Sequence, residues 1–235
     1  MRLLKGLVLA MGVALLMPAF PGAAPQGMPD QDRVVPGGGI FAPGWKGIVP
    51  DVNSIRAGHT IKDSKFSVEN GALVINSGPA GIYWNETHMA TGDYTISATF
   101  KEPSYMSSNN HDHPYGIFIG GNKLETEQHS FLYCSAYGDG RFIVRLFGPT
   151  VVNLNARGTA SEAVHKATTK GDSLTQDIAV SVKGGRVECS INGTVVAGFD
   201  KAEVVGPGKL DSTDGLYGIR VSHNLDIVVS NLKKQ

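Results

Sequence analysis

Residues 176–199 read QDIAVSVKGGRVECSINGTVVAGF, and this stretch decides the fold. Apolar and polar side chains alternate on both sides of the glycine pair 184–185, so a two-residue turn there brings every apolar residue to one face. The pairs in this register are Val182 with Val187, Val180 with Cys189, and Ile178 with Ile191. A second turn signal, Asn192-Gly193, predicts a third strand with Val196 beside Cys189. The stretch therefore predicts a three-stranded meander with one core face.

A second hairpin is predicted over residues 131–147, FLYCSAYGDGRFIVRLF. If residues 138–140 form a three-residue loop, Tyr137 pairs with Arg141 and one face is wholly apolar. A slip by one residue would place Arg145 in that face, where an unpaired guanidinium costs several kcal/mol. The core face consists of Leu132, Cys134, Ala136, Phe142, Val144 and Leu146. The opposite face carries Phe131, Tyr133, Tyr137, Arg141, Ile143, Arg145 and Phe147.

Short runs of period two between Gly and Asn turns fill the chain from about Trp45 onward, and they predict an all-β fold. About a dozen strands are too many for an immunoglobulin domain and fit a larger antiparallel two-sheet jelly-roll sandwich. One helical turn is expected over 200–205, capped by Asp200. The expected strands are 66–68, 72–77, 81–84, 93–100, 115–120, 130–137, 141–147, 150–154, 176–183, 186–191, 194–199, 215–222 and 225–232.

The N-terminus has the layout of a secretory signal over residues 1–24: basic residues, an apolar run of about 11 residues, then small residues. This run is too short to cross a bilayer, which needs about 20 residues, so no membrane span is expected. Residues 25–44 are rich in Pro and Gly and are expected to form an extended leader, with the jelly-roll domain over 45–235. The sequence thus predicts export to the periplasm or the extracellular space.

Charge composition excludes one class of partner. Lys plus Arg number 21 and Asp plus Glu number 21, so no basic excess is available to neutralise nucleic-acid phosphates. The sequence also lacks a Gly-x-Ser-x-Gly, a His-Glu-x-x-His and a phosphate-binding glycine loop, which removes the commonest hydrolase and nucleotide-binding interpretations. No cofactor is expected.

Six short segments resemble the concanavalin-like and laminin-G-like jelly rolls, in particular the secreted 3-keto-disaccharide hydrolase group (a domain of unknown function). The resemblance spans roughly residues 45–235 and implies a sandwich whose last strand returns beside an early one. Members of that fold bind glycans, cleave glycosidic bonds or contact proteins, so the fold alone does not choose a function. The segments are FSVENGAL (66–73), GDYTISA (92–98), YGIFIG (115–120), VSVKG (180–184), ING (191–193) and GLYGI (215–219).

Two carboxylates, Glu125 and Glu127, are the first catalytic candidates. Side chains two apart on a strand share a face and could hold carboxyl groups at the spacing of a retaining glycosidase. Laminarinase-type jelly rolls carry a Glu-x-Asp-x-x-Glu run, however, and this chain has no third carboxylate at the required offset. Because glycines lie just upstream, a solvated loop is the favoured interpretation.

His111, Asp112 and His113 form the densest polar cluster and are the second catalytic candidates. They could ligate a divalent metal or place a general base beside an orienting carboxylate. Three consecutive residues rarely converge on one ion, so a metal site would need a distant partner such as His129, His165 or His223. A plain polar loop is the favoured interpretation, and no metal ligand is assigned.

The aromatic and arginine face of the second hairpin allows two interpretations. Tyr133, Tyr137, Arg141 and Arg145 suit a glycan platform, because sugar rings stack on aromatic rings and their hydroxyls accept hydrogen bonds from arginine. Alternatively, these residues form an internal layer beneath the 156–172 loop. Tyr83 and Trp84 could extend either arrangement.

Three functions follow from these observations. The leading hypothesis is a carbohydrate-associated domain that binds a glycan on its concave sheet. The second is a hydrolase acting on glycosidic bonds, and the third is a structural module that contacts envelope proteins. Cys134 and Cys189 both fall on core faces. They form a disulfide only if their strands are neighbours or face each other unusually closely; otherwise they are buried thiols.

Overall fold

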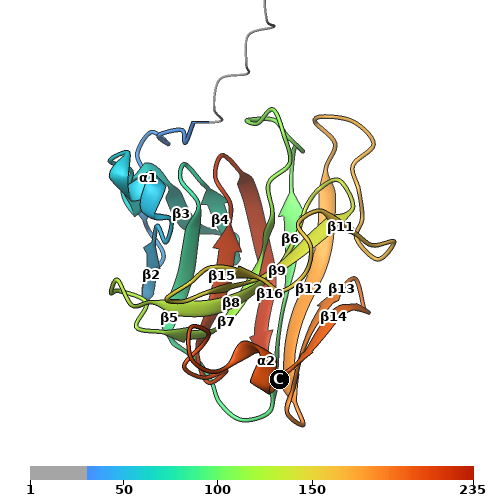
Figure 1. Ribbon diagram of the computed structural model, residues 1–235. Helices are drawn as coiled ribbons and strands as arrows, with labels where there is room; N and C mark the ends of the chain where they lie inside the picture. The colour runs from blue at the N-terminus through green and yellow to red at the C-terminus, as the bar shows by residue number, and fades with distance from the viewer. Residues whose placement is uncertain (1–30) are drawn as a thin grey trace, which may run out of the picture.

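The computed structural model describes residues 31–235, which fold into two β-sheets packed face to face (Figure 1). The predicted signal and the first residues of the predicted leader lie outside this range. The first sheet has the strand order β1-β3-β4-β16-β6-β12-β13-β14. Its strands are β1 (Gly39–Ile40), β3 (Lys65–Glu69), β4 (Ala72–Asn76), β16 (Asp226–Lys234), β6 (Tyr94–Glu102), β12 (Leu174–Lys183), β13 (Arg186–Ile191) and β14 (Thr194–Asp200).

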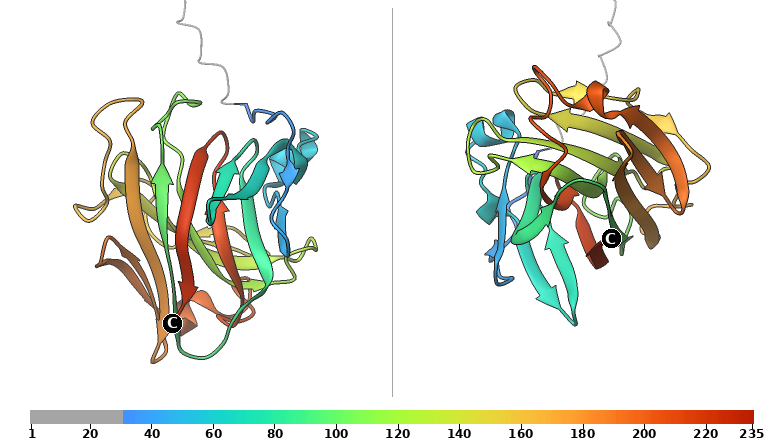
Figure 2. Two further views of the ribbon diagram at one scale, coloured as in Figure 1. Left: turned by 180° about the vertical axis from the view of Figure 1, so that it is seen from behind. Right: turned by 90° about the horizontal axis from the view of Figure 1, so that it is seen from below.

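The second sheet has the order β10-β9-β8-β7-β15-β5-β2, with β11 also paired to β9. Its strands run across those of the first sheet, as the front and rear views show (Figures 1 and 2). The pairing is antiparallel throughout, whereas the first sheet has one parallel pair, β1 with β3. Its strands are β10 (Val152–Asn153), β9 (Arg141–Phe147), β8 (Ser130–Ala136), β7 (Tyr115–Asn122), β15 (Gly215–Val221), β5 (Gly81–Ala90), β2 (Trp45–Ile48) and β11 (Thr159–Ala160).

Both predicted hairpins are confirmed residue by residue. Val182 pairs with Val187 and Val180 with Cys189 in β12–β13, and the Tyr137 amide donates to the Arg141 carbonyl at the end of β8–β9. The last strand, β16, lies between β4 and β6, as the resemblance implied. The predicted position of Val196 is wrong by one residue. Cys189 pairs with Ala197, because a β-bulge opposite Cys189 and Ser190 inserts one extra residue into β14.

Buried aliphatic and aromatic side chains from both sheets form the main core, and the predicted core faces of both hairpins lie in it. Cys134 on β8 and Cys189 on β13 form a disulfide between the two sheets, with their Cα atoms 5.9 Å apart. Packed sheets usually lie about 10 Å apart, so the sheets approach unusually closely at this point. The disulfide left open by the sequence is therefore present, and it joins facing strands rather than neighbouring ones.

Short helices and the N-terminal segment complete the fold. The predicted turn is α2 (Lys201–Val204), with a capping box between Asp200 and Glu203. An unpredicted helix, α1 (Val52–Arg56), begins after Asp51, whose carboxylate accepts from the amides of the first turn. Residues 33–41, part of the predicted leader, lie against the domain through β1 and the hydrogen bonds of Arg33. Within residues 31–235 no helix has the length and apolar character needed to cross a membrane.

Candidate functional site

The outer face of the second sheet, which points away from the first, carries a second buried cluster of large side chains. Tyr133 is only 2% exposed, and Trp84 and Tyr137 are also buried there. The neighbouring Tyr83 points the opposite way, into the main core, where its ring stacks on Phe66 at 4.8 Å. These four rings therefore pack within the protein and present no stacking surface for a sugar. The cluster comprises Ile82, Trp84, Phe118, Leu124, Phe131, Tyr133, Tyr137, Ile143 and Phe147.

Two guanidinium groups on the same face keep contact with solvent. Arg141 and Arg145 both project from β9 and are half-buried. The Arg141 guanidinium lies over the Tyr137 ring, 4.8 Å from its centroid, and Arg145 Nε donates to Asn153 Oδ1 at 2.6 Å. Tyr133 is directly opposite Arg145 in the β8–β9 register. The rings of the buried tyrosines thus lie next to the two arginine side chains. We call Arg141 and Arg145 of β9, together with Asn153 of the neighbouring β10, the β9 arginine strip.

A third arginine lies deeper in the same face. Arg220 on β15 is 7% exposed, and its guanidinium lies 5.4 Å from the centroid of the Tyr133 ring. Arg220 donates to the Val221 carbonyl, but its Nε has no hydrogen-bond partner among the described residues. Burial lowers the pKa of this guanidinium. An unpaired buried donor costs roughly 1–3 kcal/mol, so this guanidinium, which forms no ion pair with any residue of 31–235, is an unusual component of an otherwise apolar layer.

Asp112 joins the β9 arginine strip to the loop between β6 and β7. It accepts from the Tyr105 hydroxyl, and its other oxygen lies 3.4 Å from Arg141 Nη2. Arg141 is also paired with Asp139 through its Nε. Burial and the neighbouring Asp139 charge raise the pKa of Asp112, and Arg141 opposes this shift. A predicted catalytic residue and a predicted binding residue therefore meet in one fixed network.

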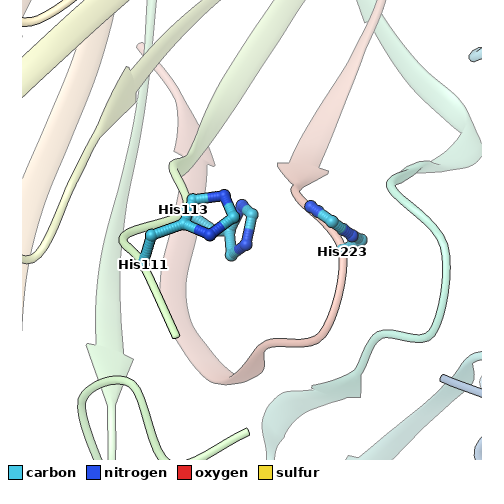
Figure 3. Close-up of side chains that lie close together, drawn as sticks. All are labelled: His111, His113 and His223. Atoms are coloured by element: carbon cyan, nitrogen blue, oxygen red, sulfur yellow. The ribbon is translucent and has the colours of Figure 1, made fainter. Parts of the chain in front are cut away.

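His111 and His113 lie on the same loop, and the structure brings a third histidine to them. His223 lies in the turn between β15 and β16, and its ring centroid is 4.0 Å from that of His113 (Figure 3). His111 and His113 have centroids 4.3 Å apart. One ring nitrogen from each of the three residues lies within 4.8 Å of the other two. Of the three distant partners that the sequence offered, the fold selects His223; His129 and His165 lie elsewhere.

Glu125 and Glu127 lie apart from this region, on the loop between β7 and β8. They line a groove of about 570 Å³ that is bounded on its other side by Ile48, Pro50 and α1. Glu125 is exposed and forms an ion pair with Lys46 at 3.0 Å. The structure thus places both carboxylates on a solvated loop, which is the favoured interpretation of the sequence, and separates them from the other candidates.

One buried acidic residue was not predicted from the sequence. It lies at the end of the sandwich that carries His111, His113 and His223, which we call the histidine end. Glu102, the last residue of β6, is 3% exposed and accepts from the Met106 amide at 3.2 Å. Burial, together with the charges of Asp112 and Asp226, raises its pKa to about 7. The predicted strand ended at residue 100, two residues before Glu102, and acidic residues beyond a strand end are usually exposed.

Comparison with known proteins identifies the fold and nothing narrower. No protein-family model matches the chain, and no curated protein matches its sequence. Among solved structures, the carbohydrate-binding module CBM66 of Bacillus subtilis matches with a TM-score of 0.54 and 10% identity, over 82% of this chain and 95% of that one. The endo-β-1,3-glucanase of Pyrococcus furiosus matches with a TM-score of 0.51 and 14% identity, over 83% and 88%. The chain therefore has the concanavalin-like jelly-roll fold that its sequence resembled.

Proposed function

We propose that this protein is an exported, carbohydrate-associated domain that binds a glycan along the β9 arginine strip. The observation that carries the proposal is the fixed geometry of Arg141 and Arg145. Each guanidinium is half-buried, held by a hydrogen-bonding partner and adjacent to a buried tyrosine of the same face. Donors held in this way lose little conformational entropy when they bind sugar hydroxyls.

The surroundings of the strip support a polar ligand with many hydroxyl groups. Asp112 and Asp139 supply acceptors beside the Arg141 donors, and Asn153 adds an amide beside Arg145. A glycan hydroxyl both donates and accepts, so it can use both kinds of group. The jelly-roll fold, shared with a carbohydrate-binding module and a glucanase, is compatible with this role. The disulfide between the sheets supports export, because such bonds persist in oxidising compartments.

Arg145→Ala is the test of this proposal. Arg145 forms no ion pair within residues 31–235, so its removal leaves no carboxylate there unpaired. Wild-type protein and the variant are compared on a glycan array, and the dissociation constant of the best ligand is measured by calorimetry. Loss of a charged hydrogen bond is worth roughly 1.5–3 kcal/mol, so affinity should fall about 10- to 100-fold with little change in Tm. Lys183→Ala, an exposed position on the first sheet, is the matched control.

The same assay separates the competing functions. Release of products from the bound glycan would favour the hydrolase hypothesis, for which the raised pKa values of Asp112 and Glu102 supply the candidate acids. Equal affinity of wild type and Arg145→Ala would exclude the strip as the binding site. If no glycan is bound or cleaved, the proposal fails and a protein-contact role becomes the better one.

A further inference from the structure

We propose that His111, His113 and His223 bind one divalent transition-metal ion, of which zinc fits best. The first argument is convergence. The three side chains come from positions 111, 113 and 223, and the fold brings one nitrogen from each within 4.8 Å of the others (Figure 3). Imidazole is the commonest metal-binding side chain in proteins, and three histidines are a known zinc ligand set.

The second argument is the orientation of two of the rings. His223 Nδ1 lies 2.8 Å from a carboxylate oxygen of Asp32, and Asp32 is itself fixed by the Ser54 hydroxyl at 2.7 Å. His111 Nδ1 lies 2.7 Å from the side-chain oxygen of Asn110. In metal sites the ring nitrogen opposite the metal is usually bound in this way, by a carboxylate or an amide oxygen. In both residues, Nε2 is then the nitrogen that a metal would use.

The third argument is the fit of the cluster to a particular class of ion. Tetrahedral zinc with Zn–N distances of about 2.0–2.1 Å places its nitrogens roughly 3.3 Å apart, so the cluster must contract slightly. His111 is exposed and lies on a loop, which allows this movement. A purely imidazole donor set disfavours calcium and magnesium, which prefer oxygen ligands. Three protein ligands would leave a fourth position for water.

A bound ion would also have a structural effect. It would join the β6–β7 loop to the turn between β15 and β16 and, through Asp32, to the N-terminal segment. An ion that binds only the folded state raises the melting temperature in proportion to the logarithm of its concentration. Arg145→Ala leaves all three histidines in place, so the glycan test and the zinc test can fail separately.

The test uses chelator-free protein without a histidine tag. Metal content is measured by mass spectrometry, zinc binding by calorimetry, and coordination by the visible spectrum of the cobalt-substituted protein. We expect one zinc per chain, a tetrahedral cobalt spectrum and a higher Tm with zinc. His111→Ala and His223→Ala should each weaken binding at least 10-fold, and Asp32→Asn should weaken it about 10- to 100-fold without changing the stoichiometry. His165→Ala, a histidine outside the cluster, is the control.

Three results would overturn the proposal. The first is wild-type protein that binds no zinc and shows no Tm change with added zinc. The second is unchanged zinc affinity in His111→Ala, a variant at an exposed position whose folding is checked by circular dichroism. The third is stronger binding of calcium than of zinc, which would indicate oxygen ligands rather than these histidines.

Discussion

Glu102 shows how burial changes the protonation of one residue. Its carboxyl group lies at the end of β6, and its raised pKa of about 7 means that the folded protein holds this proton more tightly than the unfolded chain. The stabilisation is therefore complete below the ordinary glutamate pKa of about 4.5. It is lost as the pH rises from there through 7, by an amount of roughly 3 kcal/mol.

Glu102→Gln should remove this dependence, because a neutral amide of similar size needs no proton. The free energy of unfolding, measured by urea denaturation between pH 4.5 and 8, should fall less steeply with pH in the variant than in the wild type. Glu127→Gln changes an exposed carboxylate and serves as the control. Identical slopes in the wild type and Glu102→Gln would show that folding does not shift the pKa of the Glu102 carboxyl.

The disulfide links two strands of different sheets, β8 of the second sheet and β13 of the first. It closes a loop of 55 residues, and the chain-entropy relation assigns such a loop about 4 kcal/mol of stabilisation. Replacing Cys134 and Cys189 together with Ala should lower the free energy of unfolding by up to this amount. Thiol titration of the denatured, unreduced wild type should detect no free thiol, and two reactive thiols would contradict the assigned bond.

Strand pairing was predictable because it depends on alternation within short stretches. The registers of β12–β13 and β8–β9 follow from apolar side chains two residues apart, and the turn at Asn192 and Gly193 from local backbone preference. The bulge at Val196 shifts the alternation of β14 by one residue, and the register derived from the turn at Asn192 and Gly193 did not include it. Alternation also cannot reveal whether a second apolar face is covered. The burial of Tyr133 could therefore be recognised only from the structure.

The histidine cluster was only half visible in the sequence. His111 and His113 are adjacent on one loop, but the choice of His223 over His129 and His165 depends on β15 pairing with β7 in the second sheet. That pairing joins residues about 100 positions apart, and no local pattern specifies it. The contact of Asp32 with His223 was not predicted for a different reason. A Pro- and Gly-rich segment predicts an extended leader and not a segment docked on the domain.

Across the whole molecule, the docked segment 31–41 connects the N-terminal residues to the histidine end of the sandwich. The Arg33 side chain anchors this segment to the domain through several hydrogen bonds. Its Nε donates to the Ser77 carbonyl at 2.8 Å, and its Nη2 lies 2.5 Å from the Asp226 carboxylate. The backbone amide of Arg33 also donates to the Asn224 side chain at 2.8 Å. The neighbouring Asp32 then reaches His223 from a fixed position.

Arg33→Ala should therefore loosen the segment and weaken zinc binding together. Removal of the guanidinium leaves the buried Ser77 carbonyl without its side-chain donor and the Asp226 carboxylate with the Asn76 amide but no cation, so the free energy of unfolding should fall by about 1–3 kcal/mol. Hydrogen exchange should become faster at Val35, Gly39 and Phe41, whose amides donate to carbonyls of residues 63–66. Arg157→Ala, at an exposed position, is the control. Unchanged exchange in Arg33→Ala would show that β1 pairing alone holds the segment. Faster exchange with unchanged zinc affinity would show instead that Asp32 stays in place without Arg33.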